Sequence, residues 1–278
     1  MNIIGLFEEL KIDKSHILLF STEDIMRVEK QLNVEKRINP EIDSKTSENL
    51  ILALKEYKEE LLFVLSNRIL FNFFTGNNFS KNHFSNYDLT VSNEKMKHFI
   101  ALFLAEDLIS FFSLKLSKGW YHYLEKLDLL LDLKRYFPEE IIYKMASLVF
   151  SKLDFAVSQL TVLTTNEVSN IVYIKYRTFY DLLSHFATIE SDQKISNLLS
   201  LVIKFYNKKV NTVFFTSVIE AMSFYTAFNE NINETLAKNR DAVSVLRESA
   251  DDVAATPVMK IILAVICAIL PFLVTKCS

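Results

Sequence analysis

Apolar residues recur along most of the chain at the three- and four-residue spacing of an amphipathic helix. The spacing is clearest between Leu50 and Phe73 and between Phe99 and Leu116. Several of these segments are apolar on more than one face, which is typical of helices buried on several sides. The pattern therefore predicts an all-α protein: a bundle of about eight to ten helices with a core rich in Phe and Leu, ending in a C-terminal hydrophobic helix.

Capping residues, glycines and prolines divide this pattern into segments. Ser21, followed by acidic residues and later by Pro40, predicts a helix over about residues 22–37. What precedes it fits a short helix or a strand. Further helices are expected near 44–75, 92–118, 120–137, 138–162, 166–188, 192–207, 212–228 and 231–249. Residues 76–91 predict a long loop held to the body by Phe79, Phe84 and Tyr87.

The scarcity of glycine argues against β-rich folds and against glycine-rich nucleotide-binding motifs. The chain has 3 Gly in 278 residues, whereas β-rich folds use glycine in turns and bulges. Neither a Rossmann turn nor a P-loop can be assembled from so few glycines. We expect one helical domain over residues 1–250, with a subdivision near 76–91 or near 137, followed by a separate tail over 254–278.

That tail is the most informative stretch of the chain. From Ala254 to Thr275 there are 22 residues with one charge, Lys260, and the uninterrupted apolar run from Ile261 to Thr275 has 15 residues. At about 1.5 Å per residue the run spans about 22 Å, which is short for a hydrocarbon layer of ~30 Å. Two interpretations are open: a membrane anchor beginning near Pro257, or a final core helix.

We favour the anchor, because the run is apolar on every face whereas the other helices carry charges every few residues. The residues expected in the bilayer are Ile261, Ile262, Leu263, Val265, Ile266, Ile269, Leu270, Phe272, Leu273 and Val274. Basic residues precede the run (Lys238, Arg240, Arg247 and Lys260), and only Lys276 follows it. By the positive-inside rule the helical domain would face the cytoplasm.

The cysteines and the N-terminus predict a cytoplasmic location for the helical domain of this membrane-associated protein, and the net charge bears on its partners. Cys267 and Cys277 both lie in the last twelve residues, so no disulfide framework or CxxC metal site is expected. The N-terminus has an acidic pair where a secretory signal would be basic. The net charge of −3 argues against a nucleic-acid partner.

Candidates for catalysis are weak. No histidine stands in a metal-binding pattern, so we expect neither a metal nor a cofactor. Arg177 and His185, with seven residues between them, resemble the Arg and His pair of HEPN ribonucleases, but at a wider spacing than that family uses. Glu106 and Asp107 interrupt an apolar segment, and we expect them to be partly buried carboxylates with raised pKa values.

Three functions follow from these observations. The first is a non-enzymatic, tail-anchored scaffold that holds a protein partner at a membrane. Bcl-2-like proteins share this layout, although their groove motif is missing here and the single tryptophan, Trp120, stands in KGWYHY. The second is an effector whose tail forms homo-oligomers and permeabilises a membrane. The third is a soluble helical enzyme or RNA-binding domain in which the tail is core.

Overall fold

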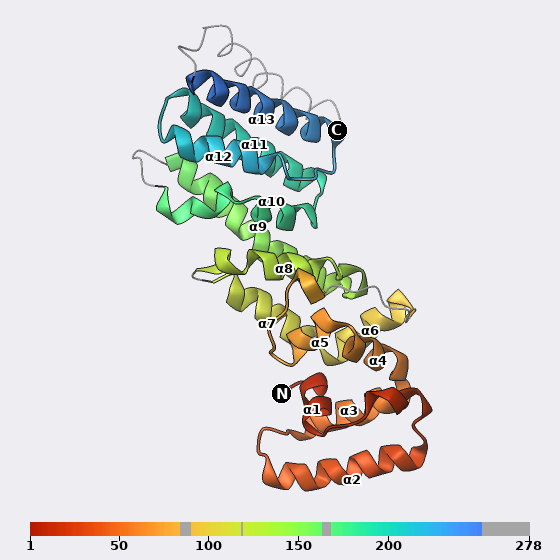
Figure 1. The fold of residues 1–278 in the computed structure, drawn as a ribbon. Helices are drawn as coiled ribbons and strands as arrows, with labels where there is room; N and C mark the ends of the chain where they lie inside the picture. Colours follow the sequence, from red (N-terminus) through yellow and green to blue (C-terminus); the bar gives the residue numbers. More distant parts are fainter. Residues whose placement is uncertain (84–89, 118, 163–167, 252–278) are drawn as a thin grey trace. The chain divides into compact units, whose positions relative to one another are not determined.

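The structure, a computed structural model, describes residues 1–83, 90–117, 119–162 and 168–251. Every regular element in these ranges is a helix, so the all-α prediction is confirmed for the described part of the chain (Figure 1). The helices are more numerous than the predicted eight to ten. The expected C-terminal hydrophobic helix lies outside the described residues.

The described part contains thirteen α-helices and five 3₁₀-helices (η). They are α1 (Ile3–Glu9), η1 (Lys14–Leu19), α2 (Thr22–Ile38), α3 (Ser44–Glu56), α4 (Lys58–Ser66), α5 (Arg68–Phe74), η2 (Lys81–His83), α6 (Asn93–Phe103), α7 (Ala105–Lys115), η3 (Trp120–Tyr123), α8 (Leu124–Leu131), η4 (Lys134–Tyr136), α9 (Glu139–Val162), η5 (Ser169–Lys175), α10 (Arg177–Ser184), α11 (Ile189–Asn207), α12 (Thr212–Met222) and α13 (Glu230–Asp251).

The higher count arises because long expected helices are interrupted. The segment predicted as one helix over 44–75 forms α3, α4 and α5. One break is at Tyr57, and the other is at Asn67, whose backbone is extended and whose side-chain oxygen accepts hydrogen bonds from the amides of Ile69 and Leu70, both at 3.1 Å. Asn67 therefore acts as an N-cap inside an apolar pattern that continues on both sides of it.

Four other predicted helices also differ. The segment 92–118 breaks at Leu104, whose φ of −133° is not helical, into α6 and α7. The segment 120–137 combines α8 with two 3₁₀-helices, and 166–188 becomes η5 and α10 around the extended Tyr176. In the segment predicted as a helix over 212–228, α12 ends at Met222, and an irregular loop follows it.

Other boundaries agree with the capping signals. Ser21 begins α2 with a capping box completed by Asp24. Helix α11 has a second capping box, in which Thr188 is the N-cap and Ser191, expected as the start, is the third helical residue. Phe79 is buried, as the loop prediction requires. Phe84 and Tyr87 lie outside the described residues.

The chain forms two compact units, Met1–Met145 and the part from Ala146 onward, and the boundary lies within α9. In the first unit α3 packs against α1 and α2, while α4 packs against η1, α5 and α6. Phe99 and Phe112 are fully buried there.

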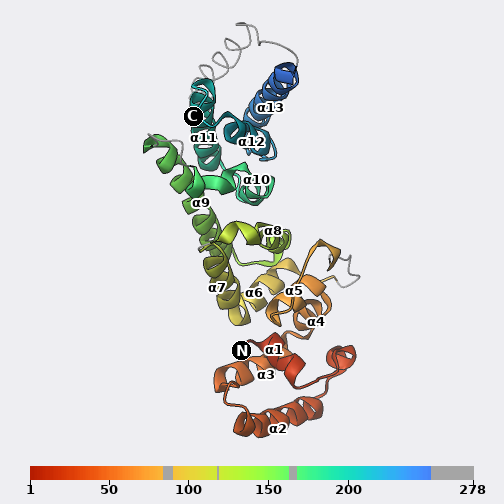
Figure 2. The ribbon, with the colours of Figure 1, turned by 60° about the vertical axis from the view of Figure 1, so that its left-hand side comes forward.

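In the second unit α12 contacts α11, α13 and η5, and both views show α11 and α12 side by side (Figure 1, Figure 2). Its largest fully buried side chains include Phe179, Tyr180 and Phe215. Each unit thus has its own core. Among the described residues, Leu is the most frequent buried type in both cores, and Phe is frequent in the first as the sequence predicts, whereas Ile and Val outnumber Phe in the second.

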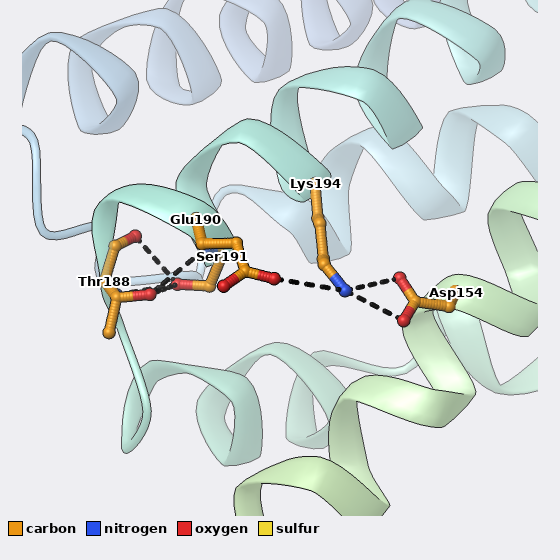
Figure 3. A network of polar contacts seen from close by, with 5 residues as sticks. All are labelled: Asp154, Thr188, Glu190, Ser191 and Lys194. Atoms are coloured by element: carbon orange, nitrogen blue, oxygen red, sulfur yellow. Dashed lines mark hydrogen bonds and ion pairs between the residues drawn. The ribbon is translucent and has the colours of Figure 1, made fainter. Parts of the chain in front are cut away.

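A polar network joins α9 to α11 in the second unit (Figure 3). The Lys194 ammonium lies 2.8 Å from both carboxylate oxygens of Asp154 and 3.7 Å from the carboxylate of Glu190. The Lys194 ammonium also lies 5.8 Å from the centre of the Phe150 ring. These contacts connect α9 to the first two turns of α11.

Candidate functional site

The ten residues expected in the membrane, Ile261 to Val274, lie outside the described residues. Among the described residues, no helix combines the length and the apolar character that a bilayer span requires. The anchor hypothesis therefore remains a prediction from the sequence.

Helix α10 holds the two residues of the HEPN-like pattern at its opposite ends. Arg177 is its first residue and His185 follows its last, so about 12 Å of helix axis separates their Cα atoms. Arg177 Nε donates a hydrogen bond to Asp181 Oδ2 at 3.2 Å, and the guanidinium carbon lies 4.1 Å from the centre of the Phe224 ring. Arg177 is thus engaged with Asp181 and Phe224.

The two acidic candidates differ in environment. Asp107 is half-buried in the first turn of α7, and it accepts a hydrogen bond from Asn2 Nδ2 at 3.2 Å. Burial raises the pKa of the Asp107 carboxyl. Glu106 is exposed. Asn2 also donates to the Phe74 carbonyl at 3.0 Å, so the Asp107 carboxylate is part of a junction between α1, α5 and α7.

Asp107 and Glu106 both line a hollow of about 520 Å³ in the first unit, formed by the start of α1, the start of α3 and the α6–α7 break. Its third carboxylate, Asp43, caps α3: the Thr46 amide donates to it at 2.7 Å, and this hydrogen bond lowers the pKa of Asp43. Two of the three carboxylates therefore have a structural partner. In the described part of the chain, no three His, Cys, Asp or Glu side chains are grouped to hold a metal ion.

A different cluster, which was not predicted from the sequence, is centred on Asp192 in α11. This carboxylate is 4% exposed and accepts three hydrogen bonds: from the Tyr225 hydroxyl at 2.8 Å, the Phe228 amide at 3.2 Å and the Asn229 amide at 2.8 Å. Ser191 Oγ also lies 3.0 Å from the Tyr225 hydroxyl. Burial raises the pKa of Tyr225, so its hydroxyl stays a donor at neutral pH.

These bonds fix the loop of residues 223–229, which follows α12. Two further backbone amides are tied to other elements: Thr226 N–H donates to Ser184 Oγ at 2.8 Å, and Ala227 N–H donates to Asn233 Oδ1 at 2.7 Å. Four consecutive amides, from residue 226 to residue 229, thus donate to side chains of α10, α11 and α13. The loop is a fixed part of the second unit.

Around this fixed loop, large side chains are exposed to solvent. Phe228 is 66% exposed, and Ile189, three residues before Asp192, is 61% exposed. Phe224 is 40% exposed and supports Arg177, whose side chain is 63% exposed. We call these four residues the loop surface. Sequence reasoning missed it because apolar residues continue beyond α12 at helical spacing, and the expected helix 212–228 therefore concealed the loop.

Comparison with known proteins does not extend this description. No protein-family model matches the chain, and no significant match is found among curated proteins or among solved structures. The candidate sites are therefore judged on their own geometry.

Proposed function

We propose that this protein is a non-enzymatic interaction module that holds a protein partner at a membrane. In this proposal the loop surface of the second unit contacts the partner, and the hydrophobic C-terminal segment inserts in the bilayer. The helical domain would face the cytoplasm.

One observation supports the proposed partner contact: Phe224 and Phe228 are exposed on a loop whose backbone is fixed by hydrogen bonds, and Arg177 of α10 is stacked on Phe224. Such residue types dominate the energetics of protein–protein interfaces. A contact surface that is already ordered loses little conformational entropy when it binds. Phe228 and Ile189 would supply apolar contact area, and Arg177, stacked on Phe224, would supply a directional hydrogen-bond donor.

The membrane half of the proposal is supported by the sequence of the tail alone. From Ala254 to Thr275 the 22 residues contain only one charge, and Lys260, near the start, can reach the interface with its flexible stem. Basic residues before the segment favour a cytoplasmic domain.

A photo-crosslinking amino acid at position 228 of the full chain, expressed in its native host, tests the partner half. We expect a discrete crosslinked product that is lost when Arg177→Ala is added. Val213, which is 84% exposed in the same unit, provides the matched control position and should give no such product. Equal crosslinking from both positions, or none from residue 228, would refute the proposed surface.

Fractionation of the full chain beside a version ending at Ala254 tests the membrane half. We expect the full chain to stay in the membrane fraction after a carbonate wash and to be released by detergent, while the shorter version stays soluble and folded. A soluble full chain together with an aggregating short version would instead show that the tail belongs to the core.

A further inference from the structure

Helix α13 contacts the rest of the second unit through a narrow stripe. In the part of α13 whose side chains are described, the buried residues are Ile232, Thr235, Leu236, Asn239 and Val243. Two of these five are polar. Its neighbour is α12, whose own buried residues are all apolar.

Asn239 is the unusual member of this stripe. It is 0% exposed, its Nδ2 donates to the Thr235 carbonyl at 2.8 Å within the same helix, and its Oδ1 has no hydrogen-bond partner. An acceptor buried without a donor opposes burial, because water would satisfy it if the helix moved away. The docked state of α13 therefore contains a penalty that the released state lacks.

In the part of α13 whose side chains are described, residues 230–245, the polar contacts beyond the first turn lie within the helix. Thr235 Oγ1 donates to the Asn231 carbonyl at 2.7 Å, Lys238 pairs with Glu234 at 3.2 Å, and Arg240 pairs with Asp241 at 2.9 Å. The cross-element bond lies at the start of the helix, where Asn233 accepts from the Ala227 amide.

The elements that precede α13 are held much more firmly. Helices α11 and α12 are joined by the stacked rings of Phe205 and Phe215, whose centres lie 5.3 Å apart, and Phe215 is fully buried. The Asp192 carboxylate fixes the chain at Phe228 and Asn229, directly before α13 begins. A backbone segment fixed by a buried carboxylate is thus followed at once by a helix whose described docking contacts are mainly three apolar side chains, Ile232, Leu236 and Val243.

We propose that α13 is a releasable arm, which detaches from α12 as one helix by turning at residues 229–230 while α11 and α12 stay folded. A helix of 22 residues is about 33 Å long, so its release displaces the segment that follows it by a distance of that order. The proposal does not require the partner or membrane roles above: release breaks the bond from the Ala227 amide to Asn233, while the three bonds that Asp192 accepts stay in place.

Hydrogen exchange of the full chain, followed by mass spectrometry, tests the arm. We expect the amides of residues 234–245 to exchange through an opening that does not expose α11 or α12. Asn239→Leu removes the unpaired acceptor and should lower the opening constant of α13 about tenfold, with no change in α11 or α12.

Asn231→Leu is the matched control, because it makes the same change at an exposed position of the same helix and should alter the exchange of α13 little. Leu236→Asn adds a second buried amide and should increase exchange in α13 selectively. The proposal is overturned if α13 exchanges only together with α11 and α12. It is also overturned if Asn239→Leu protects no better than Asn231→Leu, or slows exchange equally across the unit.

Discussion

Asp107 shows how one residue can combine a structural bond with an electrostatic cost. Its carboxylate accepts a hydrogen bond from Asn2, yet burial raises the pKa above the usual 3.8. The folded state therefore binds the Asp107 proton more tightly than the unfolded state does. By linkage, this residue lowers the free energy of unfolding as the pH rises from about 3.8 through the folded pKa.

Asp107→Asn should consequently raise the free energy of unfolding at pH 7, because the amide keeps an acceptor for Asn2 and cannot ionise. The gain should shrink toward zero near pH 3.5, where the wild-type carboxyl is protonated. Urea unfolding at both pH values measures the difference. Glu106→Gln, at the exposed neighbour, should change stability by less than about 0.5 kcal/mol. A gain from Asp107→Asn that is equal at both pH values would contradict the electrostatic explanation.

Lys209 has a strained backbone conformation that glycine would adopt more easily. It lies in the turn between α11 and α12 with a φ of 56°, and Asn211 in the same turn has a φ of 44°. A residue with a Cβ atom loses about 1–2 kcal/mol in this left-handed region, whereas glycine adopts it readily.

Lys209→Gly should therefore stabilise the protein, by about 0.5–1 kcal/mol after the greater entropy of glycine in the unfolded chain is subtracted. Thermal and chemical denaturation provide the measurement. Lys208→Gly, at a neighbour with a φ of −77°, should give no stabilisation. Equal effects of the two substitutions would exclude backbone strain as the cause.

At the scale of the elements, the loop after α12 depends on one side chain. Asp192→Ala leaves the Tyr225 hydroxyl and two backbone amides without their acceptor. The two amides are part-buried and the Tyr225 hydroxyl keeps Ser191 Oγ at 3.0 Å, so each lost bond should cost about 1 kcal/mol, and we expect a loss of about 3 kcal/mol in the free energy of unfolding. Tyr225→Phe removes only one of these bonds and should cost about 1 kcal/mol. If the two variants lost equal stability, the backbone bonds would contribute nothing.

The sequence predicted that the described elements are helices far better than it predicted where each helix ends, although it left the segment before residue 22 open between a short helix and a strand. Ser21 marked the start of α2 because its hydroxyl and the Asp24 carboxylate form a local capping box. Breaks at Leu104 and after Met222 were missed, because apolar spacing continues through them and tertiary packing decides where the helix stops. Asn67 did carry a signal, since its residue type favours N-caps, but the apolar residues around it obscured that signal.

The candidate sites were predictable only where the pattern was local. The interruption of an apolar segment pointed to Glu106 and Asp107 as partly buried acids. Asp107 is half-buried and burial raises its pKa, whereas Glu106 is exposed. The role of Asp192 could not be read in the same way, because its partners lie 33 to 37 residues away. The loop surface depends on these distant contacts, so it became visible only in the folded unit.

At the scale of the whole molecule, the chain is divided into two units that each have a core. Phe112 in the first unit and Phe215 in the second are both fully buried. Changing either residue to Ala should lower the free energy of unfolding by about 3–5 kcal/mol. Hydrogen exchange should show the larger loss of protection in the unit that carries the substitution. A uniform loss along the chain from either variant would show that the two cores unfold as one.

The Asp192 bonds also bear on how long the folded state survives. They join residues 33 to 37 positions apart in the sequence, so they require the loop after α12 to have reached α11. We expect them to form after the transition state of folding. Interactions that form after the transition state act mainly on the unfolding rate. Stopped-flow measurements on Asp192→Ala should therefore show faster unfolding with nearly unchanged refolding. This single carboxylate would thus set the lifetime of the loop surface, and with it the time over which a bound partner could be retained.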